Sequence, residues 1–249
     1  MSDALLSMLD YQLRLLPGLA LFIAVIALLP RRLLLLRAVL YILIFVLVRD
    51  LATPLGMWRL GAEHTFWLRF AADPTLMWMF SGIGLLFAAV LWWVDPELRA
   101  LVTWHQGSPV VSVAAGIGVA VLITAPWVAH GLGVPLEHRG GAVEPSLITP
   151  ILGTSIAFNL VEELLFRGYY QGALEHHKLS PQRAAVLSGL TFGAGHAFLA
   201  STVTDVGWPL LLFATWEGLI VAFLRTRLGL LAAVVAHGLA IAIMASAVV

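Results

Sequence analysis

Three ionisable residues, Glu162, Glu163 and Arg167, lie together inside a stretch that is otherwise apolar enough to cross a membrane. An ionisable side chain in hydrocarbon costs about 2.5–3.5 kcal/mol on scales of membrane insertion. Such a group is therefore stable only where its side chains face one another or a cavity that holds water. We interpret the run Glu-Glu-Leu-Leu-Phe-Arg as a candidate functional site.

The spacing of these residues predicts different roles for the two glutamates. Because a helix turns about 100° per residue, Glu163 and Arg167 share a face and form an ion pair, whereas Glu162 lies about 140° from Arg167. We expect Glu163 to be neutralised and to act as a positioning group, with Asn159 supporting it from one turn earlier. Glu162 then points elsewhere and is the candidate general base.

Two histidines occupy later apolar segments. His196 ends the run Thr-Phe-Gly-Ala-Gly-His, and His237 stands directly before Gly238. Glu162, His196 and His237 therefore each fall within a different apolar segment, a coincidence that is improbable unless these segments converge. Three glycines near His196 allow a second helix to approach closely: Gly189, Gly193 and Gly195.

Acids and histidines inside a membrane suit three kinds of chemistry: activation of a water for hydrolysis, binding of a metal, or a proton relay. The sequence has neither a Gly-x-Ser-x-Gly nucleophile elbow nor a His-Glu-x-x-His zinc motif. The alternative is purely structural, with buried acids that specify helix packing. Glu217, midway along another apolar segment, most simply forms a structural hydrogen bond; otherwise it lines the cavity near the histidines or pairs with Arg37.

The elements that must position these residues are membrane helices. Of the 249 residues, 61% are hydrophobic and 11% are charged, and the mean hydropathy is +0.96. Soluble domains carry about 45–50% apolar and about 25% charged residues. We therefore expect an all-α, polytopic bundle in the lipid bilayer, which is the inner membrane if the chain is bacterial. The zero net charge gives no argument for nucleic acid, and the absence of cysteine excludes disulfides and thiolate chemistry.

Crossing a bilayer takes about 20 apolar residues, which predicts about eight spanning helices. The polar loop 130–146 is the one plausible internal boundary, so residues 1–145 form N-terminal helices without a recognised motif and residues 146–249 form the catalytic bundle. The mixed segment 49–73 is expected at the membrane interface. A slight excess of Lys and Arg beside the first loop favours both termini on the non-cytoplasmic side. The expected spans cover residues 13–29, 33–48, 74–94, 109–129, 147–175, 181–200, 208–224 and 229–249.

The motifs in the second region resemble those of a known family. Glu162-Glu163-Leu-Leu-Phe-Arg167 resembles the Glu-Glu-x-x-x-Arg motif of the CAAX-protease and bacteriocin-processing (Abi) intramembrane proteases, which include the type II CAAX prenyl endopeptidases. The run from Phe192 to His196 resembles their second motif, Phe-x-x-x-His. Ala236-His237 resembles the start of the third, commonly His-x-x-x-Asn. The resemblance covers about residues 146–249.

The resemblance implies a glutamate-dependent endopeptidase that requires no metal or other cofactor. Its implied substrate is a peptide or protein at the membrane that carries a C-terminal processing or sorting signal, a prenyl group or a bacteriocin-type leader. The implied roles are water activation by Glu162 and His196, pairing of Glu163 with Arg167, oxyanion stabilisation by His237, and packing by Phe192.

The sequence departs from the family pattern at Ile241, where the third motif commonly has Asn. An isoleucine side chain cannot donate a hydrogen bond, and loss of one oxyanion donor typically lowers a rate by about 10²–10³-fold. Either another donor serves, with Asn159 and Thr191 as candidates, or this branch uses a different geometry, or its activity is impaired.

We therefore predict an intramembrane endopeptidase in which Glu162 and His196 activate water. The alternatives are a zinc-dependent intramembrane peptidase that uses Glu162, His196 and His237, a proton-coupled transporter, and an inactive relative that only binds a partner.

Overall fold

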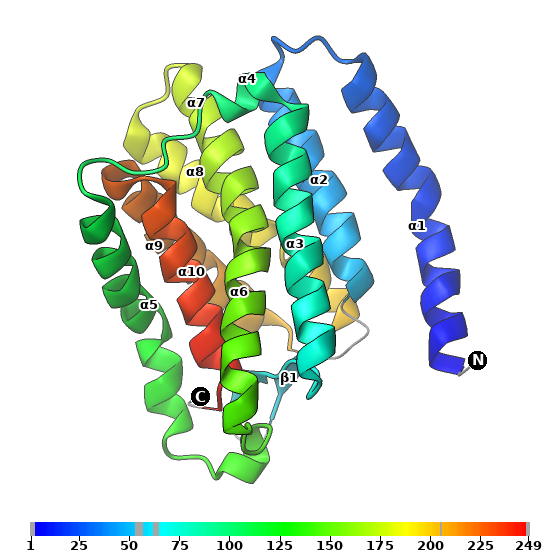
Figure 1. Cartoon of the computed structure of the whole chain (residues 1–249), viewed down its shortest axis with the longest axis vertical. Coiled ribbons are helices and arrows are strands. Elements are labelled where there is room, and N and C mark those ends of the chain that lie inside the picture. Colours follow the sequence, from blue (N-terminus) through cyan, green and yellow to red (C-terminus); the bar gives the residue numbers. More distant parts are fainter. Residues whose placement is uncertain (1–2, 53–56, 62–64, 205, 248–249) are drawn as a thin grey trace.

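The chain folds as a bundle of helices, and the computed structural model describes residues 3–52, 57–61, 65–204 and 206–247 (Figure 1). Within these residues the only sheet is a two-stranded antiparallel hairpin, β1 (Trp58–Leu60) and β2 (Phe66–Leu68). The all-α, polytopic prediction is confirmed.

Helices form in each of the eight predicted spans, although some consist of more than one element. The fifth span is a continuous segment from Pro145 to His176 that changes its helical type three times, and a second π-helical segment begins at the end of the sixth. The α-helical and π-helical elements are α1 (Asp3–Leu28), α2 (Leu34–Ala52), α3 (Pro74–Val94), α4 (Pro96–Arg99), α5 (Pro109–Gly131), α6 (Ile148–Glu163), η5 (Leu164–Tyr170), α7 (Gln171–His176), α8 (Pro181–Ala194), η6 (Leu199–Val203), α9 (Trp208–Leu228) and α10 (Leu230–Ala245).

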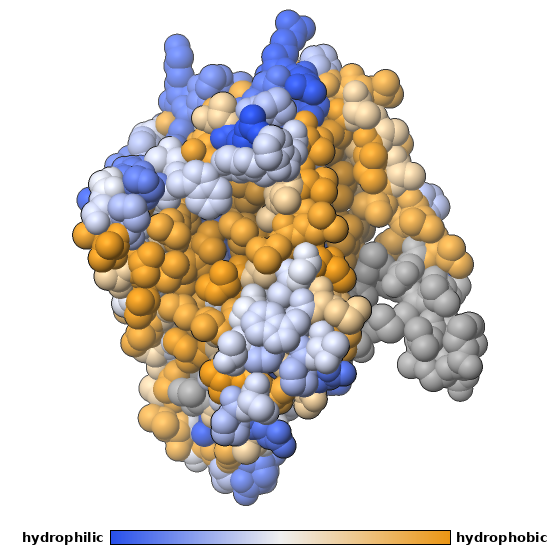
Figure 2. All heavy atoms as spheres, in the orientation of Figure 1, coloured by the Kyte–Doolittle hydropathy of each residue, from blue (hydrophilic) through white to orange (hydrophobic). Residues whose placement is uncertain are grey.

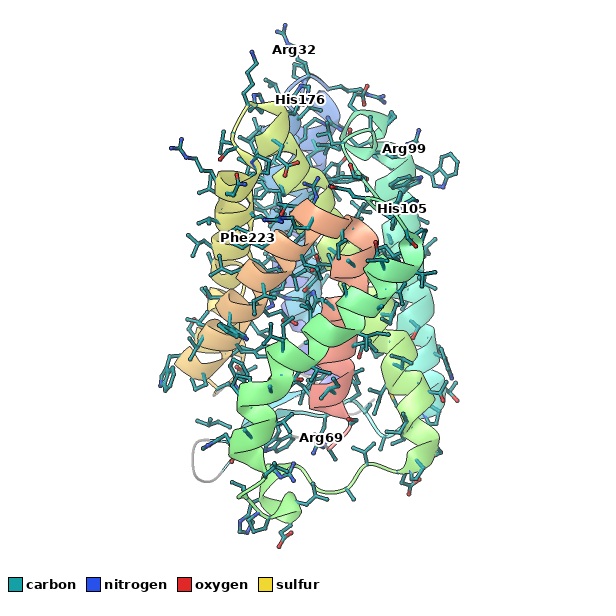
Figure 3. All side chains as sticks on the ribbon, turned by 90° about the vertical axis from the view of Figure 1, so that its left-hand side faces the viewer. Arg32, Arg69, Arg99, His105, His176 and Phe223 are labelled. Carbon is teal, nitrogen blue, oxygen red and sulfur yellow. The ribbon has the colours of Figure 1, made fainter. Side chains whose placement is uncertain are left out.

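The surface of the bundle is that of a multi-pass integral membrane protein. Among the described residues, five helical segments are long and apolar enough to cross a bilayer, and two shorter apolar helices, 13–28 and 230–245, accompany them. On the face that Figure 2 shows, hydrophobic residues cover much of the middle of the molecule, and hydrophilic residues gather at its two ends. Arg32, Arg99 and His176 lie at one end and Arg69 at the other (Figure 3). Both ends of the chain lie toward the Arg69 end (Figure 1).

Local sequence signals account for where several helices begin. Asp73 caps α3 through hydrogen bonds that its carboxylate accepts from the backbone N–H groups of Thr75 and Leu76. The hydroxyl of Ser180 accepts from the N–H of Arg183 and caps α8. In both helices proline occupies the first turn, where the missing N–H costs no hydrogen bond.

Glycines bring α8 and α9 into close contact, as expected from their spacing. A Cβ added at Gly189 would lie 2.8 Å from the Cα of Leu219, and one added at Gly218 would lie 2.8 Å from the carbonyl oxygen of Gly189. A larger residue at either position would push the two backbones apart. The helices that carry His196 and Glu217 are therefore held at a fixed, short separation. Gly195 differs, since its nearest neighbours include its own segment's backbone rather than α9.

The segment 49–73 is more structured than an interfacial loop. Arg49 belongs to α2, and the β1–β2 hairpin follows; residues 53–56 and 62–64 lie outside the described residues. Arg69 then ties this hairpin to the α5–α6 loop and to α10 by donating to the carbonyl oxygens of Arg139 at 2.7 Å and Met244 at 3.3 Å. Burial and the nearby charge of Arg139 lower the pKa of Arg69 to about 10, so that it still carries its charge at neutral pH.

Both halves of the chain contribute to each hydrophobic core. One core joins α2 residues such as Phe45 to Phe166 and Phe192, and the other joins Ile123 of α5 to Phe213 of α9. Helices α3 and α6 pack together, as do α5 and α10. The boundary near residue 145 stays a prediction about the sequence, since the helices on either side of it share their packing.

A buried ion pair fastens the first helical hairpin to the rest of the bundle. Arg37 of α2 donates from Nε to Asp95 at 2.7 Å and from Nη1 to the carbonyl oxygen of Ile26 at 2.9 Å. Asp95 also caps α4 by accepting from the N–H of Leu98. Arg37 is thus the partner of Asp95, and the alternative prediction that Glu217 pairs with Arg37 is wrong.

Replacing Asp95 with alanine should lower the stability of the protein strongly. The change leaves the Arg37 guanidinium buried without its carboxylate, which typically costs about 3–5 kcal/mol. Thermal unfolding in detergent would measure the shift. The matched control is Glu97→Ala, because Glu97 pairs with Arg31 at 3.4 Å on the surface and such pairs contribute about 0–1 kcal/mol. Equal melting temperatures for the two variants would contradict the assignment.

Candidate active site

The acidic motif lies where the helix changes its winding. Glu162 and Glu163 end α6, and the next seven residues, Leu164–Tyr170, form the π-helical segment η5 that contains Arg167. Single π turns inside helices are rare and occur frequently at functional sites. The wider turn begins immediately after the two glutamates, in the middle of a segment that spans the membrane.

Glu163 is the buried centre of a polar network. Its Oε1 atom lies 2.9 Å from Nη1 of Arg167 and 2.8 Å from Nδ1 of His237. Both Glu163 and Arg167 are fully buried. Arg167 also donates from Nη2 to the carbonyl oxygen of Gly218 in α9 at 3.1 Å. The structure therefore contains the ion pair expected from the spacing of four, and one carboxylate oxygen joins α6, η5 and α10.

Phe192 packs at the centre of this network. The guanidinium carbon of Arg167 lies 4.2 Å from the centroid of the Phe192 ring, a cation–π contact. The same ring contacts the imidazoles of His196 and His237, with centroid separations of 4.6 and 5.3 Å. Phe192 is thus in packing contact with three charged or polar site residues, as the motif resemblance implies.

The hydrogen bonds of His196 define its tautomer. Its Nδ1 lies 2.9 Å from the carbonyl oxygen of Phe192, and its Nε2 lies 3.2 Å from Nη1 of Arg49. A carbonyl oxygen only accepts and a guanidinium only donates, so Nδ1 carries the hydrogen and Nε2 accepts. His196 is therefore neutral, with the lone pair of Nε2 directed toward Arg49.

His237 lies among three carboxylates. Its Nδ1 bonds to Glu163, while its Nε2 lies 3.7 Å from Glu162 Oε2 and 3.5 Å from Glu217 Oε2. Helices α6 and α10, which carry the motif glutamates and His237, lie side by side in the bundle (Figure 1). Glu217 is almost fully buried, and its other oxygen, Oε1, has no hydrogen-bond partner. Of the roles predicted for Glu217, the structure agrees with one: Glu217 lines the cavity beside His237.

These groups meet at one cavity of about 400 Å³. The rest of the wall is mainly apolar and aromatic, contributed by α2, α3, α6, α9, α10 and the β1–β2 hairpin. The polar wall of the cavity consists of Arg49, Thr154, Ser155, Asn159, Glu162, His196, Glu217 and His237. Glu163 and Arg167 do not line it. The two adjacent glutamates therefore face different environments: Glu162 faces the cavity and Glu163 faces the packed interior.

Asn159 and Thr191, the two candidate donors in place of the asparagine expected at position 241, differ in position. Ile241 lines the cavity, and so does Asn159, but the amide of Asn159 donates to the carbonyl oxygen of Ser155 at 2.7 Å. That bond shows Asn159 directed along its own helix rather than at Glu163, which it was expected to support. Thr191 does not line the cavity, and its hydroxyl donates to Tyr170.

Arg49 is the site residue that sequence reasoning missed. It was assigned to the interfacial segment, yet it lies in the last two turns of α2, with Nη1 3.6 Å from Glu162 Oε1. The available signal was its position directly after the apolar run 38–48, which places its side chain close to the bilayer. Nothing in the first half of the sequence marked which later helix it would meet.

In the described part of the chain, no group of three or more His, Asp or Glu side chains is arranged to hold a metal ion. The three residues of the zinc alternative, Glu162, His196 and His237, line the same cavity. However, Nε2 of His196 is directed at the Arg49 cation rather than at a common point with the other two. The three side chains therefore do not converge on one metal-binding point.

The chain that forms this cavity can be compared with known proteins. A family model described as type II CAAX prenyl endopeptidase Rce1-like matches residues 144–243. This range contains every polar residue of the cavity except Arg49. Neither the curated proteins nor the solved structures include a match to the chain. Residues 144–243, which carry the acidic motif and both histidines, are therefore similar to the type II CAAX prenyl endopeptidase Rce1-like family.

Proposed function

We propose that the protein hydrolyses a peptide bond of a membrane-associated substrate with a water activated by Glu162 and His196. The observation that carries the proposal is that Glu162, His196 and His237, from three helical segments far apart in sequence, line one cavity. Glu162 Oε1 and His196 Nε2 both lie within 3.6 Å of the same Arg49 nitrogen, so they border the same small volume. A water that displaces Arg49 from Nε2 of His196 can donate hydrogen bonds to both acceptors.

In the proposed first step, the water attacks the scissile carbonyl carbon. A new C–O bond forms, the carbonyl π electrons move to the carbonyl oxygen, and the proton of the water passes to the Glu162 carboxylate. In the second step the C–N bond breaks, and Glu162 returns the proton to the leaving amine. Glu162 is thus restored as a carboxylate, and no electron acceptor or further co-reactant is needed.

His237 is the proposed partner of the carbonyl oxygen in the intermediate. Its Nδ1–H is already committed to Glu163, which fixes the ring and turns Nε2 toward Glu162 and the cavity. Three carboxylates surround this imidazole, while two arginines, Arg49 and Arg167, contact them. A proton on Nε2 would balance this charge and supply the hydrogen-bond donor.

The proposed substrate is a peptide or protein segment held at the membrane. Most of the cavity wall is apolar, with aromatic side chains from α2, α3 and α6 at Phe45, Phe80, Phe87 and Phe158. Such a surface suits an apolar or lipid-modified chain more than a soluble peptide. We propose that the segment carries a C-terminal processing or sorting signal or a prenyl group.

Replacing Glu162 with glutamine, or His196 with alanine, should lower the rate of cleavage by at least about 10²–10⁴-fold, the usual contribution of a general base. The assay is cleavage of a reconstituted membrane peptide in liposomes, with unfolding temperature as the check on folding. Matched controls are Glu137→Gln and His138→Ala, which change the same residue types on an exposed turn outside the cavity. Full activity of either site variant would refute the proposed step.

Chelators separate the glutamate reaction from the zinc alternative. We expect phenanthroline to leave the cleavage rate unchanged after prolonged incubation, because the proposed steps use only side chains and water. Elemental analysis of the purified protein should find less than stoichiometric zinc. Loss of activity on chelation, restored by added zinc, would decide for the metal-dependent reaction instead.

A further inference from the structure

Arg49 reaches the cavity from a part of the chain that the family motifs do not cover. It lies in α2, whereas the matched family model begins at residue 144. Its side chain is 14% exposed, and it donates from Nη2 to the carbonyl oxygen of Gly195 at 2.7 Å. This bond anchors the guanidinium directly beside His196, in the segment that follows α8.

The two adjacent glutamates each face an arginine, but the two pairs differ. Arg167 and Glu163 are 2.9 Å apart and fully buried on one helical segment. Arg49 and Glu162 are 3.6 Å apart, come from different helices and border the cavity. The first pair is closed, whereas the second is loose enough to rearrange around a bound substrate. The Arg49 guanidinium therefore holds the Glu162 carboxylate at the cavity wall, where a base must lie.

Arg49 also controls the state of His196. Because a guanidinium is always a donor, its Nη1 at 3.2 Å from Nε2 keeps that nitrogen as an acceptor. The Phe192 carbonyl holds the hydrogen on Nδ1 from the other side of the ring. The ring is therefore held in one tautomer, with its one Nε2 lone pair occupied by Arg49 until the guanidinium moves and a water takes its place.

The position of Arg49 fits the charge movement of the reaction. As Glu162 takes the proton of the water, its negative charge disappears and an equal charge develops on the substrate carbonyl oxygen. A cation next to Glu162 is close to both locations and stabilises the second when the first is lost. Ile241, where the motif commonly has an amide donor, cannot do this from its place on the same cavity wall.

We propose that Arg49 is a positioning residue of this site: it orients the Glu162 carboxylate, fixes the tautomer of His196 and places at the cavity a hydrogen-bond donor, which Ile241 lacks. The inference rests on the proposed peptidase function. It assigns part of the active centre to the N-terminal helices.

The first test is chemical rescue of Arg49→Ala in proteoliposomes. We expect kcat to fall by about 10²-fold, in the range for loss of one charge-stabilising donor. Added guanidinium ion at millimolar concentration should restore at least about a tenth of the activity, whereas urea, a neutral molecule of similar shape, should not. The control is Arg59→Ala, which removes an exposed arginine of β1 and should leave kcat and its response to guanidinium unchanged.

Two results would overturn the assignment of Arg49. One is a wild-type kcat in Arg49→Ala under conditions where Glu162→Gln is inactive. The other is a loss of activity that guanidinium and urea restore equally or not at all while the unfolding temperature stays that of the wild type.

A second measurement does not depend on cleavage, so it separates this inference from the proposed function. In the wild type, ¹⁵N spectra of labelled histidine should show His196 as the neutral tautomer protonated at Nδ1, with its signals identified by their loss in His196→Ala. In Arg49→Lys and Arg49→Ala the Nε2 signal should shift, because its donor has changed or gone. If the wild type cleaves no substrate but this shift occurs, the peptidase proposal fails and the positioning role stands. An unchanged Nε2 signal would refute the positioning role whatever the activity.

Discussion

A single carboxylate oxygen in the membrane interior holds the functional half of this protein together. Oε1 of Glu163 meets Arg167 and His237 at hydrogen-bonding distances, and Arg167 in turn contacts the Phe192 ring and the backbone of α9. An unpaired charge at this depth would be costly, so the bundle is stable only with these partners in place. The requirement to satisfy one acid fixes the relative positions of α6, α8, α9 and α10.

This constraint explains how two neighbouring glutamates acquire different surroundings. Glu163 takes the closed interior position, which leaves Glu162 on the adjacent face, toward the cavity. Arg167 completes the buried pair from the π-helical turn that follows. Two identical side chains, one residue apart, thus have different exposures to solvent and substrate because the helix has only one inward face.

The sequence was most informative where the physical cost was largest. Charges in an apolar segment predicted the Glu163–Arg167 pair and the separate direction of Glu162, because few arrangements of such groups are tolerable in lipid. Hydropathy predicted the positions of the helices, and glycine spacing predicted the α8–α9 contact. The sequence did not predict the β1–β2 hairpin, because its strands are only three residues each. Nor did it predict the two π-helical segments, which depend on packing around the site.

Contacts between helices distant in sequence were predicted least well. Arg37 and Arg49 both lie in α2, and nothing local distinguishes the one that pairs with Asp95 from the one that reaches Glu162. Their partners follow from the packing of α2 against the rest of the bundle, which residue spacing within one helix does not report. Even a prediction within one helix failed at Asn159. Its amide was expected to support Glu163 but donates to the backbone carbonyl oxygen of Ser155.

The location of His237 in α10, after all the other site residues in chain order, has a consequence for how the protein is made. Ribosomes deliver helices to the membrane from the N-terminus onward, so Glu163 is inserted long before the imidazole that shares its carboxylate oxygen. A nascent chain that lacks α10 has an incomplete polar network and an unfinished cavity wall. Formation of the site is thereby coupled to the synthesis and insertion of α10.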